Sequence, residues 1–350
     1  METVSSRLKG IVDVATAWRD ADYGPRRHAV QRTLEAPNQW TEPALNHALD
    51  RWMERLTREA IDAWVGDAPA DRTGRIGLLH GTEEPLSGLR DALAVWALGY
   101  DSVGAVPESS PALLPAIAED VDAQLPRVEI EFISVEDTLS GADAVIAAPH
   151  LPLEDVAAAC EENGLGPDRR LLRAEGFSVG LVDGHESEDE MERLAEDMLL
   201  YEGHGRRRLA VLWAPSDHPP DAYLEAMARF RGLFPAHEDT PGTLQMQQAF
   251  LEARDAPHAY ADGLEFLVSR GDPEAQKPGH VRWAEYDSLD DVGSWWASHR
   301  DRVYAVIARR HLHDQCPADW PLRTPGGVHV PPLDDEEGRR VVQFLATLGD

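Results

Sequence analysis

A turn near the middle of the chain combines glycines with residues that could contact a ligand. It lies between Leu200 and Trp213 and contains Gly203, His204, Gly205 and Arg206 in succession. A glycine has no Cβ, so the backbone of such a turn can approach a ligand closely. A guanidinium stays protonated at any usable pH, so Arg206 can bind an anion but cannot act as a nucleophile. The turn therefore predicts a ligand-binding seam whose central residue has no covalent chemistry.

The three consecutive arginines of this turn, Arg206 to Arg208, admit two interpretations. They could clamp a phosphate or carboxylate group through bidentate hydrogen bonds, which predicts a small anionic ligand. They could instead be solvated or paired with acidic residues, since the chain has 63 Asp and Glu against 33 Lys and Arg. The sequence leaves both interpretations open.

The only two thiols of the chain, Cys160 and Cys316, are poor candidates for catalysis. Cys160 lies on the apolar side of an expected helix, which favours a buried structural cysteine over a reactive thiol. Cys316 follows His311 and His313, a spacing that could bind a metal, but no second pair of ligands accompanies them. We therefore predict no metal site. Two cysteines exclude a disulfide framework and indicate a reducing, cytoplasmic location.

Standard nucleotide-binding motifs are absent from the sequence. The turn after the first expected strand reads Gly81-Thr82-Glu83-Glu84-Pro85 in place of G-x-G-x-x-G. Its two carboxylates would repel a pyrophosphate group. No Walker sequence and no G-x-S-x-G sequence occurs either.

The composition excludes several classes of partner. A net charge of −30 argues against binding to nucleic acid or to an anionic membrane. The chain shows no apolar run as long as a membrane span and no N-terminal apolar h-region, so we expect neither a membrane span nor a signal peptide. Only Lys9 and Lys277 are lysine. High acidity with few lysines is typical of a protein adapted to strong brine, where salt screens self-repulsion; the alternative is an ordinary acidic cytosolic protein.

The secondary-structure elements that position these residues differ between the first part and the rest of the 350-residue chain. Apolar periodicity predicts helices up to about residue 70, followed by alternating strands and helices. Ser187 and Glu190 form a capping box at the start of the helix that leads into the turn. The pattern predicts an α/β fold with parallel sheets. The expected ranges are a helical segment 1–70, a first α/β domain 71–184 that includes a fifth strand at 177–182, a second α/β domain 185–325 and a C-terminal segment 326–350 that packs back on the body.

Several segments together resemble the LuxC-type long-chain acyl-CoA reductases, relatives of the aldehyde dehydrogenase superfamily. The resemblance covers nearly the whole chain and is carried by 85–91, 143–147, 178–201, 285–289 and 332–345. It implies a two-domain aldehyde-dehydrogenase-like fold with a Rossmann-like parallel-sheet domain. It also implies that a cysteine in a Gly-x-Gly-Cys turn attacks acyl-CoA and that NADPH then releases an aldehyde. Superfamily relatives are often dimers or tetramers, so the resemblance leaves open whether this chain forms a homo-oligomer.

The sequence departs from this family at the positions that the resemblance assigns to catalysis. Arg206, preceded by His204 and Gly205, stands where the family has its cysteine. Glu83 lies near the position of a family asparagine that polarises the acyl oxygen, and a carboxylate would oppose an oxyanion there.

The cofactor-binding positions implied by the resemblance are also substituted. Ala105 stands where the family usually has a lysine that contacts the cofactor. Pro149 and His150 replace a Gly-Ser pair that lets the cofactor phosphate lie close to the backbone. Pro107 and Gly88 complete the set of implied cofactor positions.

Two hypotheses follow from the scaffold and its departures. The first is a degenerate acyl-CoA reductase that keeps the fold but has lost catalysis, and that binds acyl-CoA or another small anion or acts in regulation. The second is an active reductase with rearranged catalytic groups. Whether the chain is an enzyme is left open by the sequence.

Overall fold

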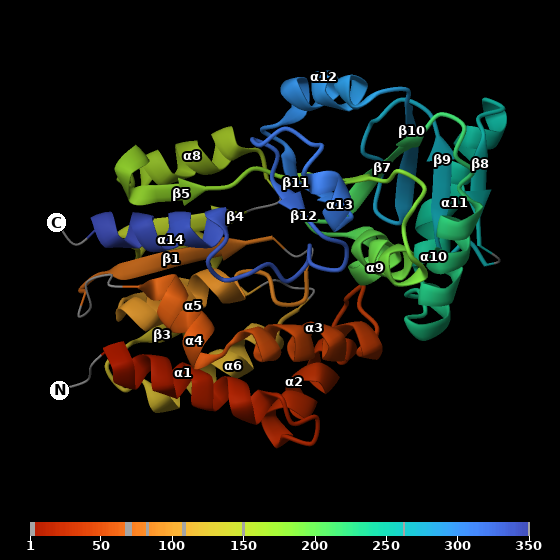
Figure 1. Ribbon diagram of the computed structural model, residues 1–350. Helices are drawn as coiled ribbons and strands as arrows, with labels where there is room; N and C mark the ends of the chain where they lie inside the picture. The colour runs from red at the N-terminus through yellow and green to blue at the C-terminus, as the bar shows by residue number, and fades with distance from the viewer. Residues whose placement is uncertain are drawn as a thin grey trace. The chain divides into compact units, whose positions relative to one another are not determined.

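A computed structural model describes residues 4–66, 72–81, 84–106, 110–148, 151–261 and 263–348. The chain divides into two compact units. Unit 1 contains Met1–Asn38, Leu45–Glu175 and Pro331–Asp350, and unit 2 contains Gln39–Ala44 and Gly176–Val330. Each unit is built from more than one stretch of chain, whereas the expected domain ranges are continuous. Each unit has its own sheet (Figure 1).

Unit 1 contains a five-stranded sheet in which all described pairs are parallel. The strand order is β3-β2-β1-β4-β5. Since β1 and β4 are neighbours, the order of strands reverses between them, which makes this point a candidate ligand-binding crevice. The strands are β1 (Arg75–His80), β2 (Asp101–Gly104), β3 (Ile130–Phe132), β4 (Ala144–Ala148) and β5 (Arg170–Leu172).

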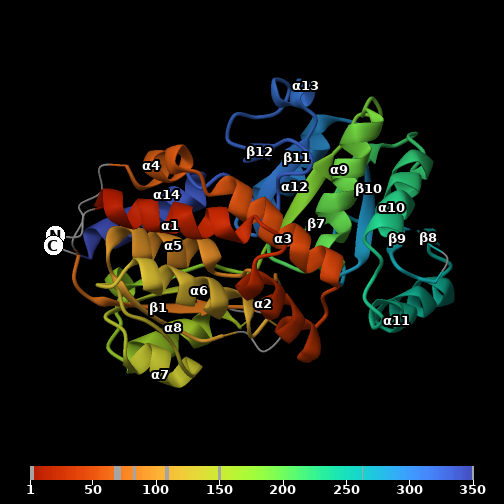
Figure 2. The same cartoon turned by 90° about the horizontal axis from the view of Figure 1, so that it is seen from below.

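Helices cover both faces of this sheet. Figure 2 shows α5 and α6 on one side of β1 and α7 and α8 on the other. The helices of unit 1 are α1 (Val4–Trp18), α2 (Gly24–Glu35), α3 (Glu42–Arg55, whose first residues belong to unit 2), α4 (Arg58–Val65), α5 (Leu89–Leu98), α6 (Leu113–Gln124), α7 (Val135–Ser140), α8 (Leu153–Glu162) and α14 (Glu336–Thr347), with a 3-10 turn η1 (Pro167–Arg169).

The C-terminal helix α14 is tied to unit 1 by buried hydrogen bonds. The Trp64 indole donates to the Gly338 carbonyl at 2.9 Å, and the Tyr100 hydroxyl donates to the Leu345 carbonyl at 2.8 Å. The Arg90 guanidinium pairs with Asp335 at 2.7 Å. The segment beginning at Pro331 thus completes the core of unit 1.

Unit 2 contains a seven-stranded sheet of order β12-β11-β6-β7-β10-β9-β8. All of its described pairs are parallel except the edge pair of β8 and β9. Its strands are β6 (Phe177–Leu181), β7 (Leu209–Pro215), β8 (His258–Tyr260), β9 (Leu267–Arg270), β10 (His280–Tyr286), β11 (Val303–Ala308) and β12 (Leu322–Arg323). Its other elements are α9 (Glu188–Leu199), η2 (Leu200–Gly203), α10 (Asp221–Leu233), α11 (Thr240–Ala253), α12 (Leu289–His299) and α13 (Arg310–His313).

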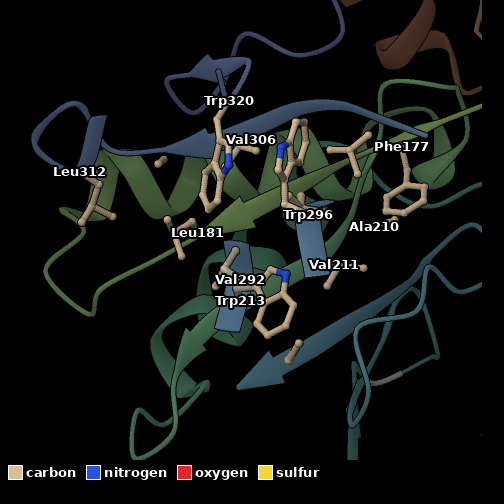
Figure 3. Close-up of a cluster of buried hydrophobic side chains, with 14 residues drawn as sticks. Phe177, Leu181, Ala210, Val211, Trp213, Val292, Trp296, Val306, Leu312 and Trp320 are labelled. Carbon is tan, nitrogen blue, oxygen red and sulfur yellow. The ribbon is translucent and has the colours of Figure 1, made fainter. Parts of the chain in front are cut away.

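An aromatic core holds one face of this sheet against α12. Trp213 of β7 and Trp296 of α12 are buried in one cluster with Trp320, and strand residues fill the space between them (Figure 3). Burying each indole stabilises the fold by about 1.5–3 kcal/mol or more. This core fixes β7, and with it the turn that precedes β7.

The structure confirms the expected α/β fold and corrects one strand assignment. Phe177–Leu181 was expected as the fifth strand of the first α/β domain, but it pairs with β7 and β11 in the sheet of unit 2. The fifth strand of unit 1 is instead β5, Arg170–Leu172, which pairs with β4. The capping box of Ser187 and Glu190 is present at the start of α9.

Candidate functional site

The turn between α9 and β7 has an unusual backbone. Tyr201 and Glu202 have φ of 55° and 57°, and Gly203 and Gly205 have φ of 67° and 97°. The left-handed region costs a non-glycine residue about 1–2 kcal/mol. A Cβ on Gly203 would lie 2.7 Å from the amide nitrogen of Gly279, so this position requires glycine. The surrounding structure must therefore hold the turn in place.

Glu202 is the buried anchor of the turn. Its carboxylate accepts hydrogen bonds from both terminal nitrogens of Arg231 at 3.2 Å and from the Thr240 hydroxyl at 2.7 Å. The side chains of Glu202 and Arg231 are 8% and 2% exposed. A bidentate, desolvated pair of this kind fixes geometry as well as charge. The pair attaches the turn to the end of α10 and the start of α11.

The three arginines of the turn have different environments. Arg208 donates to the Gly203 carbonyl at 3.0 Å and to the Gln276 carbonyl at 2.8 Å, so it supports the backbone of the turn. The guanidinium carbons of Arg206 and Arg207 lie 5.6 and 5.2 Å from the centre of the Tyr304 ring. The three arginines therefore do not form one clamp in the structure.

A third cation joins the two arginines at Tyr304. The guanidinium carbon of Arg323 lies 5.5 Å from the centre of the same ring. Cation–π attraction is worth about 0.5–2 kcal/mol per pair and offsets part of the repulsion among neighbouring guanidiniums. We call Arg206, Arg207, Arg323 and Tyr304 the arginine cluster. It concentrates positive charge at the turn of a chain whose net charge is −30.

His204 of the same turn lies among aromatic rings. Its ring is 6.5 Å from that of Trp40, in an edge-to-face arrangement. Trp40 also contacts Tyr201, whose ring is 5.1 Å from that of His329. Trp40, Tyr201 and His329 are all buried, so these rings pack as part of the core beside the turn.

Neither thiol of the chain lies at this turn. Cys160 is fully buried in unit 1, in a cluster with Val156 of the same helix, and burial raises the pKa of its thiol. Cys316 is half-buried in unit 2, where burial also raises its pKa. Its amide donates to the Leu312 carbonyl, beyond the carboxyl end of β11. Arg206 precedes the amino end of β7, so Cys316 and Arg206 lie at opposite ends of parallel strands.

A second group of polar residues lies at the carboxyl ends of the strands in unit 1. His80 ends β1, and its Nε2 lies 2.7 Å from Asp91 Oδ2 in the first turn of α5. Arg173 donates two hydrogen bonds to the Asp91 carboxylate at 2.5 and 2.8 Å. Burial alone would raise the pKa of Asp91, but Arg173 and His80 hold it well below its ordinary value. We call these three residues the Asp91 network.

Gly88, at the start of α5, packs directly against the His80 ring of this network. Its φ is 84°, and a Cβ there would lie 2.6 Å from His80 Nδ1. The His80 ring thus occupies the space directly over the amino end of α5. A small pocket of about 10 Å³, room for about one water, lies beside it and is lined by His80, Gly88, Ala105 and Glu131 among others.

The structure separates the residues that the sequence singled out. His204, Gly205 and Arg206 lie on one turn in unit 2, as expected. Gly88 and Ala105 lie together at the pocket in unit 1. The remaining expected site residues, Glu83, Pro107, Pro149 and His150, lie outside the described residues.

Most residues that build these sites carried no signal in local sequence patterns. Arg231, Tyr304 and Arg323 reach the turn from three other elements, α10, β11 and β12, whereas Glu202 belongs to the turn itself. Glu202 offered one clue, because a carboxylate directly before a glycine in a tight turn needs a partner once it is buried.

Two classes of site find no support in the described parts of the chain. They contain no group of three or more His, Cys, Asp or Glu side chains arranged to hold a metal ion. They also contain no helix with the length and apolar character needed to cross a bilayer.

The fold is that of the aldehyde dehydrogenases. An NAD-dependent benzaldehyde dehydrogenase from Corynebacterium glutamicum is similar with a TM-score of 0.70 and 10% identity, over 98% of this chain and 84% of that one. The aldehyde dehydrogenase KauB from Pseudomonas aeruginosa gives 0.67 and 13%, over 92% and 76%. The NAD+ complex of an aldehyde dehydrogenase from Bacillus cereus gives 0.66 and 12%, over 92% and 76%. No protein-family model matches the sequence, and no curated protein is significantly similar to it.

Proposed function

We propose that this protein is a relative of the LuxC-type acyl-CoA reductases that keeps their fold, has lost thiol catalysis, and acts as a binding or regulatory protein. The single observation that supports this is the turn before β7. The resemblance assigns to this turn the thiolate of an acyl-enzyme mechanism, whereas the turn carries Arg206, and both thiols of the chain lie outside it. An arginine cannot form the acyl-enzyme, because its guanidinium has no free electron pair for attack at usable pH.

The ligand that suits this turn is a small anion, with acyl-CoA as the first candidate by resemblance. Arg206, Arg207 and Arg323 concentrate positive charge around the Tyr304 ring. Guanidiniums bind phosphate and carboxylate groups through two parallel hydrogen bonds. A thiol, by contrast, reacts only with an activated acyl group. The cluster therefore favours binding of an anion over its chemical conversion.

The resemblance implies NADPH as the cofactor, but we propose that carboxylates among the described residues of unit 1 weaken or prevent binding of a nicotinamide dinucleotide. The helices α5 and α8 follow β1 and β4 and so begin at the point where a dinucleotide phosphate would bind. Asp91 lies in the first turn of α5, and Glu154 and Asp155 lie in the first turn of α8. Carboxylates at these positions compete with a phosphate for the positive end of each helix.

The proposal also includes a location and an adaptation. Cys160 and Cys316 are both free, in keeping with a reducing cytoplasmic compartment. The net charge of −30 supports adaptation to high salt, so the assays below use molar salt.

Turnover of acyl-CoA with NADPH tests the loss of catalysis. We expect no aldehyde from the native protein above the uncatalysed background. An Arg206→Cys variant returns a thiol to the turn, and an Arg207→Cys variant is the matched control with a thiol one residue along. Activity gained only by Arg206→Cys would support a lost nucleophile. Native turnover that persists after Cys160→Ala and Cys316→Ala would refute the proposal in favour of a rearranged reductase.

Titration calorimetry measures binding of NADPH and of acyl-CoA independently of turnover. We expect no saturable heat from NADPH or NADH, and a measurable heat from acyl-CoA that Arg206→Ala reduces. NADPH binding without turnover would overturn only the exclusion of the dinucleotide. Absence of acyl-CoA binding would overturn acyl-CoA as the ligand while leaving the lost nucleophile untouched.

A further inference from the structure

The Asp91 network gives His80 of unit 1 the arrangement of a general base. Although burial raises the pKa of Asp91, Arg173 and His80 hold it well below its ordinary value, so its carboxylate is ionised at neutral pH. An ionised carboxylate only accepts hydrogen bonds, so the 2.7 Å contact with Asp91 requires the proton of His80 on Nε2. In the neutral imidazole, Nδ1 then carries the lone pair that a general base uses.

Arg173 fixes the Asp91 carboxylate from a second strand end. It directly follows β5, and both of its terminal nitrogens donate to Asp91, at 2.5 and 2.8 Å. The side chains of His80, Asp91 and Arg173 are 7%, 4% and 11% exposed. No described residue donates a hydrogen bond to Nδ1 of His80. Within the described part of the chain, the network therefore orients the imidazole and leaves its basic nitrogen available.

The pocket beside His80 has the size and lining for a methyl group. It reaches the surface at half-buried His80, Ser87 and Gly88. Its buried part is lined mainly by apolar side chains, which include Leu78, Ala92, Trp96 and Leu114. A volume of about 10 Å³ admits one water or one methyl group and no longer chain, and an apolar lining favours the methyl group. The pocket therefore fits the methyl end of an acetyl group.

The amino end of α5 brings positive charge to the same place. No described side chain caps the first turn of α5, which begins after Gly88. Amide groups in the first turn of a helix carry partial positive charge and point away from the helix. Donors of this kind stabilise the oxyanion that forms when a carbonyl carbon is attacked. Arg173 offsets the opposing charge of Asp91. The site also lies at the carboxyl end of β1, beside the point where the strand order reverses.

We propose that this site hydrolyses small acetyl esters, with His80 as the general base. The methyl group lies in the pocket, and the carbonyl oxygen faces the amino end of α5. Nδ1 takes a proton from a water molecule while the water oxygen bonds to the carbonyl carbon. The bond from that carbon to the leaving oxygen then breaks, and the proton on Nδ1 passes to the leaving oxygen. The products are acetic acid and the alcohol. Asp91 and Arg173 are positioning residues.

Hydrolysis of p-nitrophenyl acetate in molar salt tests this activity. It is independent of the function proposed above, because the step uses no thiol and no residue of the arginine cluster. We expect saturable turnover that persists after Cys160→Ala and Cys316→Ala. His80→Gln keeps a donor to Asp91 but removes the base, so it should lower kcat/KM by about 100-fold or more. The matched control, His185→Gln, changes an exposed histidine of unit 2 and should have no effect.

Three results of this assay would overturn the proposal: turnover that does not saturate, turnover that is lost with the thiols, or equal losses in the two histidine variants. The acetyl pocket has a test of its own. We expect a lower kcat/KM for p-nitrophenyl butyrate, because the longer chain does not fit. An equal or higher value for the butyrate would overturn the assignment of the pocket. Ser87→Ala should keep full turnover, and loss of turnover there would overturn water as the nucleophile.

Asp91→Asn tests the positioning of His80. Arg173 can only donate, so it takes the amide oxygen and leaves the amide NH₂ group to face Nε2 of His80. Nε2 must then accept, and the proton moves to Nδ1, where it blocks the base. We expect kcat of the folded variant to fall by about 100-fold or more with little change in KM. The ¹⁵N shifts of His80 should show the exchanged tautomer. A folded variant with the native tautomer and native kcat would overturn the role of Asp91.

Discussion

The buried pair of Glu202 and Arg231 gives the sharpest energetic prediction for the turn. We consider Glu202→Leu and Arg231→Met, which remove one charge each, and the double variant, which removes both. Either single change leaves the other charge in a site where its side chain is at most 8% exposed. Breaking a buried ion pair in this way costs about 3–5 kcal/mol, whereas replacing both partners by apolar residues is often neutral.

The magnitudes follow from that difference. Each single variant should lose about 3–5 kcal/mol of unfolding free energy, which lowers Tm by about 6–20 °C for a unit of this size. The double variant should lie within about 2 kcal/mol of the native protein, so the coupling energy between the two positions should exceed about 3 kcal/mol. Glu202→Leu also deprives the Thr240 hydroxyl of its acceptor, a cost that the double variant retains.

Urea unfolding in molar salt, followed by fluorescence of the 10 tryptophans, measures these energies. Glu202→Gly is a useful companion variant, because it removes the same carboxylate but relieves the left-handed backbone at φ 57°. It should be less destabilising than Glu202→Ala by about 1 kcal/mol. Strictly additive single changes, or single losses below about 1 kcal/mol as for a surface pair, would refute the buried anchor.

Three further predictions concern buried groups. Burial lowers the pKa of His280 to about 3. The contribution of neutral His280 to the free energy of unfolding is therefore complete above the unfolded pKa of about 6.5 and is lost as the pH falls below that value. The loss is about 2 kcal/mol at pH 5, and a His280→Gln variant should lack this slope in urea unfolding. Asp91→Asn leaves Arg173 without its carboxylate and should cost about 3–5 kcal/mol in the same assay, and a loss under about 1 kcal/mol would contradict the Asp91 network. In the native protein a thiol reagent should modify Cys316 slowly and leave Cys160 untouched until urea is added, while rapid modification of both would contradict their burial.

The sequence predicts the fold well where apolar patterns are long or capped. The continuous apolar run of β4, Ala144–Ala148, and the capping box before α9 identify their elements directly. The strands β5, β8 and β12 have three, three and two residues, too few to show a pattern. The pattern of β6 identifies a strand but not its sheet, because pairing with β7 and β11 depends on residues far along the chain.

The candidate site likewise contains some residues that the sequence identifies and others that it does not. Gly203 and Gly205 identify the turn because a left-handed backbone selects glycine locally. The partners of Glu202 are not visible in this way, since Arg231 and Thr240 lie 29 and 38 residues further along the chain. Tyr304 and Arg323 are also distant in sequence from Arg206, so only the packed sheet brings the arginine cluster together.

The sheet of unit 2 also decides whether the thiol of Cys316 could reach the turn at Arg206. Arg206 precedes β7, and Cys316 follows β11 at the other end of parallel strands. The seven residues of β7 span about 23 Å at about 3.3 Å per residue, whereas a cysteine side chain reaches only a few ångströms from its backbone. To bring the Cys316 thiol to the turn, the sheet would have to unfold, and the buried tryptophans on its face oppose that. Rearranged catalysis at this turn would therefore have to use a nucleophile other than Cys316, so native turnover that is lost on Cys316→Ala in a still folded protein would contradict this placement of the thiol.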